Sequence, residues 1–134
     1  MQQNIFGCVE GAQSYYLAKY SVIGKPFIYL SRNDVELKQV ASGLLLFEPN
    51  AEVYSLPAWD CVPYDRLSPH GDITGERIST LSKLASKDLS EKKVVILLTI
   101  NSFLQKIPPK SFFSNASLLL KKGHEYNLGQ ITSF

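Results

Sequence analysis

The chain of 134 residues is 45% hydrophobic and 19% charged, which are the proportions of a single folded domain with one core. Its formal net charge of +2 is too small to indicate a nucleic-acid-binding protein on electrostatic grounds alone. The longest apolar run, Val94–Leu98, is far shorter than the roughly 20 residues of a membrane span. The first residues do not resemble a signal peptide, and Cys8 and Cys61 lack the paired spacing of a zinc site. We therefore expect no membrane association, no bound metal, and a cytoplasmic location with both thiols reduced.

Residues 7–14 have the length of a phosphate-binding P-loop, G-x-x-x-x-G-K-[ST], and read Gly-Cys-Val-Glu-Gly-Ala-Gln-Ser. The first Gly and the final Ser are present, but Ala12 stands where the second Gly belongs and Gln13 where the Lys belongs. A hydrogen bond to a charged group is worth about 1.5–3 kcal/mol, so loss of the Lys alone costs about ten- to a hundredfold in affinity. Glu10 adds a negative charge that opposes a triphosphate further. Taken alone, the segment with Gly7, Gly11, Ala12, Gln13 and Ser14 favours an accidental glycine-rich turn before a helix over a vestigial P-loop, and we expect no useful ATP binding there in either case.

The pattern up to residue 56 predicts alternating helices and strands. The expected elements are a helix that runs to Tyr20, a strand over residues 25–30, a helix over 34–47 and a strand over 51–56. Asn33 and Glu36 have the spacing of a capping box at the start of the second helix. Residues with helical periodicity predict its buried stripe: Leu37, Val40, Ala41 and Leu44.

The stretch from Leu56 to Leu81 contains three prolines and the only tryptophan. The prolines exclude a helix before Pro69, so a stiff loop is expected to enter a helix over residues 73–85. Trp59, Tyr64 and His70 suit a surface that binds a partner or stacks on a base. We favour the alternative that Trp59 and Tyr64 pack on the sheet edge and keep the loop rigid, because a single tryptophan in a small domain is usually buried.

The helix over residues 73–85 is expected to bury Ile78, Leu81 and either Leu84 or Ala85, and Arg77 is expected to form a surface ion pair. No catalytic set can be assigned, because the alternation of Ser68, His70 and Asp72 does not by itself build a triad.

Residues after 93 predict a buried strand and then a second domain. Val94–Leu98 has the continuous apolar character of a central parallel strand, and no Asp-Glu pair follows it, so it is not a magnesium-binding Walker-B strand. A helical turn is expected over residues 102–105 and a last strand over 117–121. Leu128, Ile131 and Phe134 look like the start of another helix. We predict one domain over residues 1–122 and the beginning of a following, truncated domain over 123–134.

Alternating helices and strands with long connections predict an α/β fold with a mostly parallel sheet flanked by helices.

The run from Leu56 to His70, followed by Gly-Glu-Arg-Ile-Ser-Thr-Leu over residues 75–81, resembles the N-terminal region of the bacterial transcription-repair coupling factors (the Mfd family). That region is itself similar to the first domain of the excision-repair helicase UvrB. The resemblance implies a RecA-like helicase lobe, like domain 1a of UvrB. It also favours a decayed P-loop at residues 7–14 over an accidental glycine-rich turn, because UvrB carries an intact P-loop there.

What the resemblance implies about function concerns mainly a longer parent protein. The coupling factors are ATP-dependent DNA translocases that displace stalled RNA polymerase from double-stranded DNA and recruit UvrA during nucleotide excision repair. ATP and Mg would belong to motor domains of the parent, and the UvrA-contacting surface largely to the following domain. Residues 64–74 are too few for the DNA-gripping hairpin of UvrB. The resemblance therefore implies a non-catalytic recruitment and regulatory scaffold, in contact with the rest of its own chain.

Two alternatives remain at this point. The first is a UvrB-like lobe that binds nucleotide and acts as an enzyme. The second is a DNA-binding module that uses Arg66, His70 and Arg77, although the low net charge disfavours it.

Overall fold

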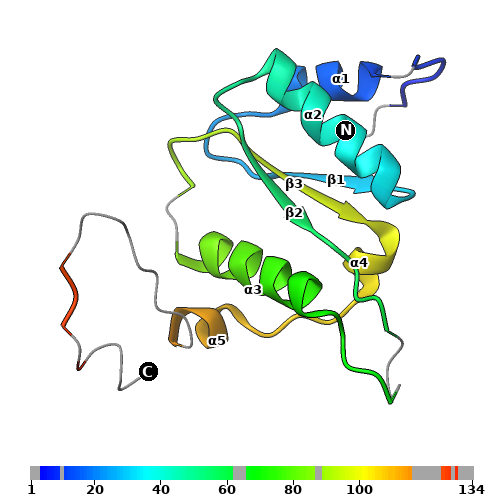
Figure 1. The fold of residues 1–134 in the computed structure, drawn as a ribbon. Helices are drawn as coiled ribbons and strands as arrows, with labels where there is room; N and C mark the ends of the chain where they lie inside the picture. Colours follow the sequence, from blue (N-terminus) through cyan, green and yellow to red (C-terminus); the bar gives the residue numbers. More distant parts are fainter. Residues whose placement is uncertain are drawn as a thin grey trace.

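The computed structural model has a three-stranded parallel sheet between two layers of helices (Figure 1). It describes residues 4–9, 11–61, 66–86, 89–115, 125–127 and 129. The elements in chain order are α1 (Ala12–Tyr20), β1 (Phe27–Ser31), α2 (Asp34–Phe47), β2 (Glu52–Leu56), α3 (Gly71–Ser86), β3 (Val94–Thr99), α4 (Ile100–Leu104) and α5 (Lys110–Asn115). The predicted α/β class with a parallel sheet is confirmed, while the likeness to a RecA-like lobe stays a prediction.

The strand order β1-β3-β2 places β3 at the centre of the sheet. The connection through α2 carries the chain from β1 past β3 to β2, and the connection through α3 returns it to β3. Right-handed crossovers that run in opposite directions require their helices on opposite faces. Figure 1 shows this arrangement, with α1 and α2 on one face and α3 and α5 on the other. The prediction of Val94–Leu98 as a central strand is confirmed.

Helix α2 begins and ends where the sequence predicts. The Asn33 side chain caps it by accepting a hydrogen bond of 2.9 Å from the backbone N–H of Glu36. Its predicted stripe is confirmed: Leu37, Val40 and Leu44 are buried, and Ala41 packs beside them. These residues form the main core with Leu17 of α1 and with Val95 and Leu97 of β3.

Helix α1 lies unusually close to α2 at one point. The Ser14 hydroxyl of α1 donates a hydrogen bond of 3.2 Å to the backbone carbonyl of Val40. Gly43, one turn further along α2, leaves room for it, because a Cβ on Gly43 would lie 2.4 Å from the Ser14 Oγ. The contact therefore depends on a small residue at position 43.

Helix α3 is rotated relative to the prediction. Ile78 is 50% exposed and Leu81 is only half-buried, so the expected apolar stripe does not form the main contact. Instead Arg77 and Thr80 are buried, because their side chains donate to backbone carbonyls at the end of β2, those of Pro57 and Ser55. Hydrogen bonding to the strand end decides which side of α3 faces the sheet, and the predicted surface position of Arg77 is wrong.

Near the C-terminus the structure adds a helix that the sequence did not predict, α5, which packs near α3. The turn predicted over residues 102–105 is α4, which begins earlier because the Thr99 side chain accepts a hydrogen bond from the Ser102 N–H. The strand predicted over residues 117–121 and the positions Leu128, Ile131 and Phe134 lie outside the described residues. The predicted domain boundary after residue 122 stays a prediction.

The close approach at Gly43 predicts opposite effects for two glycine-to-alanine changes. Gly43→Ala should lower the free energy of unfolding by about 1–3 kcal/mol, because the new Cβ must displace the Ser14 side chain. Gly75→Ala, in α3 with open space around it, should raise that free energy by about 0.5–1 kcal/mol through helix propensity. Urea denaturation of both variants tests this, and equal stabilisation by the two changes would contradict it.

Candidate functional site

Two glycines of the loop before α1 have backbone conformations that favour glycine. Gly7 and Gly11 both have left-handed backbone conformations, with φ of 69° and 88°. Gly11 is the N-cap of α1 and provides no capping side chain. These are conformations that residues with a Cβ rarely adopt, so the two glycines are needed for the turn itself.

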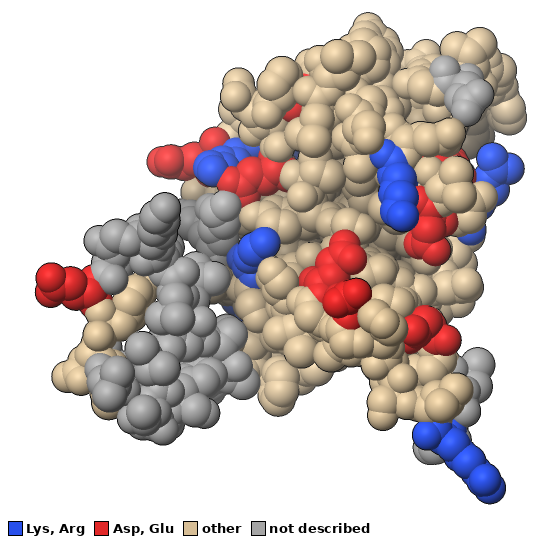
Figure 2. Space-filling view, viewed as in Figure 1, with Lys and Arg blue, Asp and Glu red and all other residues tan. Residues whose placement is uncertain are grey.

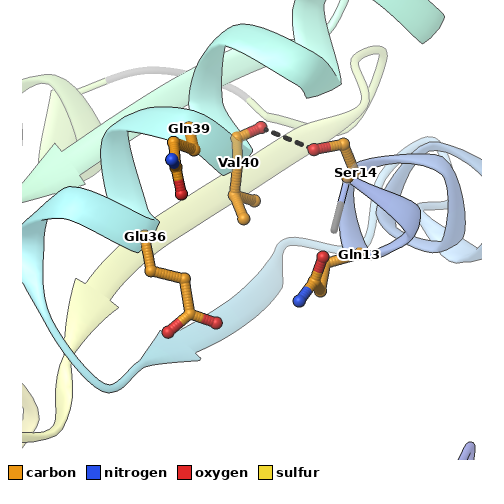
Figure 3. Close-up of a pocket in the computed structure, with 6 residues that line it drawn as sticks. Gln13, Ser14, Glu36, Gln39 and Val40 are labelled. Atoms are coloured by element: carbon orange, nitrogen blue, oxygen red, sulfur yellow. Dashed lines mark hydrogen bonds between the residues drawn. The ribbon is translucent and has the colours of Figure 1, made fainter. Parts of the chain in front are cut away.

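The serine at the end of this loop takes part in helix packing. In an intact P-loop the final Ser or Thr hydroxyl faces the magnesium ion. Here Ser14 is 1% exposed and its hydroxyl donates to the Val40 carbonyl (Figure 3). The residue that would hold the metal is therefore part of the α1–α2 contact.

Beside this contact is a hollow of about 260 Å³ that lies between α1 and α2. Gln13 lines it from α1, and Glu36 and Gln39 line it from α2. Figure 3 shows the Gln13 and Glu36 side chains extending toward the same open space. An adjoining hollow of about 390 Å³ shares these three residues and adds Arg32 at its border. The charged group placed between the two helices is thus a carboxylate.

Several donors hold the Glu36 carboxylate in place. The Tyr29 hydroxyl donates a hydrogen bond of 3.0 Å to it, and the backbone N–H and the Nε of Arg32 each lie 3.4 Å from its other oxygen. Burial by itself raises the pKa of Glu36, but the hydrogen bonds from Tyr29 and Arg32 outweigh burial and lower it. The carboxylate is therefore ionised at neutral pH.

A second polar cluster lies at the carboxyl end of β2 and holds the proline-rich loop. The Arg77 guanidinium lies over the Trp59 ring, 4.4 Å from its centroid. One guanidinium nitrogen donates to the Pro57 carbonyl, to the Ser102 hydroxyl at 3.3 Å and to the Gln105 side-chain oxygen at 3.2 Å. The same Gln105 oxygen accepts from the Trp59 backbone N–H at 3.0 Å. Arg77 thus ties the start of the loop to α3 and α4.

Arg77 is an unusual residue to find 2% exposed. No carboxylate among the described residues pairs with it, and its Nε has no hydrogen-bond partner. Burial lowers the pKa of Arg77, yet a guanidinium stays protonated in proteins. Among the described residues, the contacts of this buried cation are therefore to neutral oxygens and to the face of Trp59.

The other loop candidates have varied positions. Trp59 is half-buried against Arg77 of α3, and the interpretation of the loop as rigid stays a prediction. His70 is exposed and structural: its N–H lies 3.2 Å from an Asp60 carboxylate oxygen, and its Nδ1 accepts from the Asp72 N–H at the start of α3. Arg66 is exposed, and Tyr64 lies outside the described residues. Ser102 and Gln105 were not predicted as partners of Arg77, because both are distant from it in the chain.

The surface around these sites carries mixed charge. A groove of about 620 Å³ beside Trp59 is bordered by three acidic residues and one basic residue: Asp34, Asp60, Glu76 and Lys38. On the face in Figure 2, the Lys and Arg side chains of the described residues lie scattered among carboxylates and form no continuous basic patch. Phosphate backbones bind to basic surfaces, and the described residues on this face form none.

The described part of the chain contains neither a cluster of metal ligands nor a membrane-spanning helix. No three His, Cys, Asp or Glu side chains converge there as metal ligands would. None of the helices described is both long and apolar enough to cross a membrane.

The chain is similar to several curated proteins that share one name. No family model matches the chain. Curated relatives do: it is 33% identical to the transcription-repair-coupling factor of Rickettsia conorii over 81% of this chain and 10% of that protein. The protein of the same name from Haemophilus influenzae is 34% identical over 69% of this chain and 7% of its own length. The protein of the same name from Escherichia coli is 37% identical over 53% of this chain and 6% of its own length.

This chain is homologous to part of the transcription-repair-coupling factors. The resemblance inferred from the residues is confirmed. The chain spans about a tenth or less of the length of these curated relatives.

The proline-rich loop after β2 should depend on Arg77 for its position. Arg77→Ala should lower the free energy of unfolding by about 3 kcal/mol, because it removes charged hydrogen bonds and leaves a cavity under Trp59. Arg77→Lys should be intermediate, since an ammonium lacks the planar face. Trp59 is the only tryptophan, so its fluorescence should shift to longer wavelength in Arg77→Ala. The exposed Ser79→Ala on the same helix is the control, and an unchanged emission in Arg77→Ala would refute the stacking role.

The Tyr29–Glu36 pair of this domain predicts a loss of stability at alkaline pH. Burial and the bond to Glu36 raise the pKa of Tyr29 to about 12, against about 10 in an unfolded chain. Between these values the unfolded tyrosine has lost its proton and the folded one keeps it, so stability falls as the pH rises above about 10. Tyr29→Phe should reduce this fall, measured by urea denaturation from pH 8 to 11. The exposed Tyr20→Phe serves as control and should leave the fall unchanged.

Proposed function

We propose that this chain is a non-catalytic domain of a transcription-repair coupling factor and acts as a recruitment and regulatory scaffold. The parent protein would be an ATP-dependent DNA translocase of the cytoplasm that removes stalled RNA polymerase and recruits UvrA for excision repair. The names of the relatives support a role in coupling transcription to repair. In this proposal ATP and Mg belong to motor domains elsewhere in the parent.

The observation that carries the non-catalytic part is the position of Ser14. A P-loop serine must be free to face a magnesium ion, and this hydroxyl is buried and bonded to the Val40 carbonyl. Gln13 and Glu36 line the adjacent space, where a triphosphate would need a cation. Neither the metal nor the phosphates would find their usual partners here.

Uncovered apolar side chains support the scaffold part. Ile28 and Leu30 of β1 point to the face of the sheet where α3 lies, yet they are 51% and 44% exposed. Strands of parallel sheets are normally covered on both faces. A domain that contacts other parts of a longer protein or a partner would bury such positions.

The two alternatives are less well supported. A nucleotide-dependent lobe would need the Lys and the free hydroxyl discussed above. A DNA-binding module would lose one of its three expected contacts, because Arg77 is buried and engaged with Pro57 and Gln105. Arg66 and His70 remain exposed, but the described face offers no continuous basic surface around which a duplex would bind.

Calorimetry with Mg-ATP tests the proposal. The purified chain should release no binding heat at millimolar Mg-ATP, since both the cation and the metal-binding hydroxyl are missing from the site. Binding that is abolished by Gln13→Ala would place nucleotide at the loop and would refute the scaffold interpretation. A folded state confirmed by circular dichroism makes the absence of heat informative.

A further inference from the structure

The two adjoining hollows beside α1 and α2 have one basic residue along their border among the described residues, and this residue already has an anionic partner. Among the described residues that line the two adjoining hollows, only Arg32 is basic. Its Nε lies 3.4 Å from the Glu36 carboxylate, so the carboxylate already engages it. Its side chain is 85% exposed, and such surface pairs contribute little to stability.

Glu36, in contrast, is fixed. It is in the first turn of α2, and its oxygens accept from Tyr29 at 3.0 Å and from the Ser31 hydroxyl at 3.4 Å. Its side chain is 19% exposed. An anion with this support cannot turn away from a ligand without losing those hydrogen bonds.

We propose that Glu36 sets the charge selectivity of this hollow and is a barrier to polyphosphate that is independent of the missing P-loop lysine. The proposal rests on the proposed function and adds a second residue to it. Glu36 acts by repelling a phosphate chain directly, from a position that its hydrogen bonds hold in place.

A consequence concerns any lysine restored at position 13. Gln13 and Glu36 line the same hollow and extend toward the same space (Figure 3). A lysine there would face the Glu36 carboxylate and pair with it. Restoring the loop sequence alone would therefore supply a cation that is already neutralised.

The test compares two repaired loops. In the first, Ala12→Gly and Gln13→Lys restore the P-loop sequence. In the second, Glu36→Gln is added, which keeps an oxygen that accepts from Tyr29. The control adds Glu76→Gln to the repaired loop instead, which removes the same charge from an exposed position on α3. Calorimetry with Mg-ATP should show at least about tenfold tighter binding for the Glu36→Gln variant than for the other two.

Each outcome decides the proposal. Equal affinity with and without Glu36→Gln, or no binding in any of the folded variants, overturns it. Binding by the unmodified chain would instead refute the proposed function, so the two failures are distinguishable. If the triple variant does not fold, the single change Gln13→Lys gives a second readout. The pKa of the Glu36 carboxyl, measured by NMR, should fall below its value in the unmodified chain, and an unchanged pKa would refute the pairing.

Discussion

The hydrogen bond from the Ser14 hydroxyl to the Val40 carbonyl is the contact on which this half of the domain depends. It is possible only because Gly43 allows α1 and α2 to approach each other, and it places Leu17 in the core with Leu37 and Leu44. A residue type that belongs to phosphate-binding loops thereby serves packing. This single contact joins the two helices and leaves Ser14 only 1% exposed between them.

Two charged side chains, Arg77 and Glu36, are each held in place by several hydrogen bonds. Arg77 is a buried cation held by carbonyl, hydroxyl and amide oxygens and by the ring of Trp59. Glu36 is a held anion on the opposite face of the sheet, supported by Tyr29 and Arg32. Buried charges of this kind are costly unless every nearby donor and acceptor is arranged around them. In this domain they fix the positions of a loop and of a helix start.

The absence of cover over part of the sheet agrees with a domain that is held by other protein surfaces. Ile28 and Leu30 form an apolar strip on β1 that α3 does not reach. The chain corresponds to about a tenth of the curated coupling factors, which leaves ample protein to contact this strip in a parent of that length. A scaffold whose function is contact, rather than turnover, needs such surfaces more than it needs a pocket.

Much of the fold follows from local sequence. The Asn33–Glu36 capping spacing, the stripe of Leu37, Val40 and Leu44, and the apolar run Val94–Leu98 determine α2 and the central strand, because caps and periodicity act within a few residues. The motif around Trp59 was enough to indicate the family. Other features join residues that are far apart in the chain: the burial of Arg77, the roles of Ser102 and Gln105, the contact of Ser14 with Val40, and the position of Glu36 beside Gln13. Only tertiary packing decided them, because hydropathy does not reveal which distant oxygen a buried polar side chain will find.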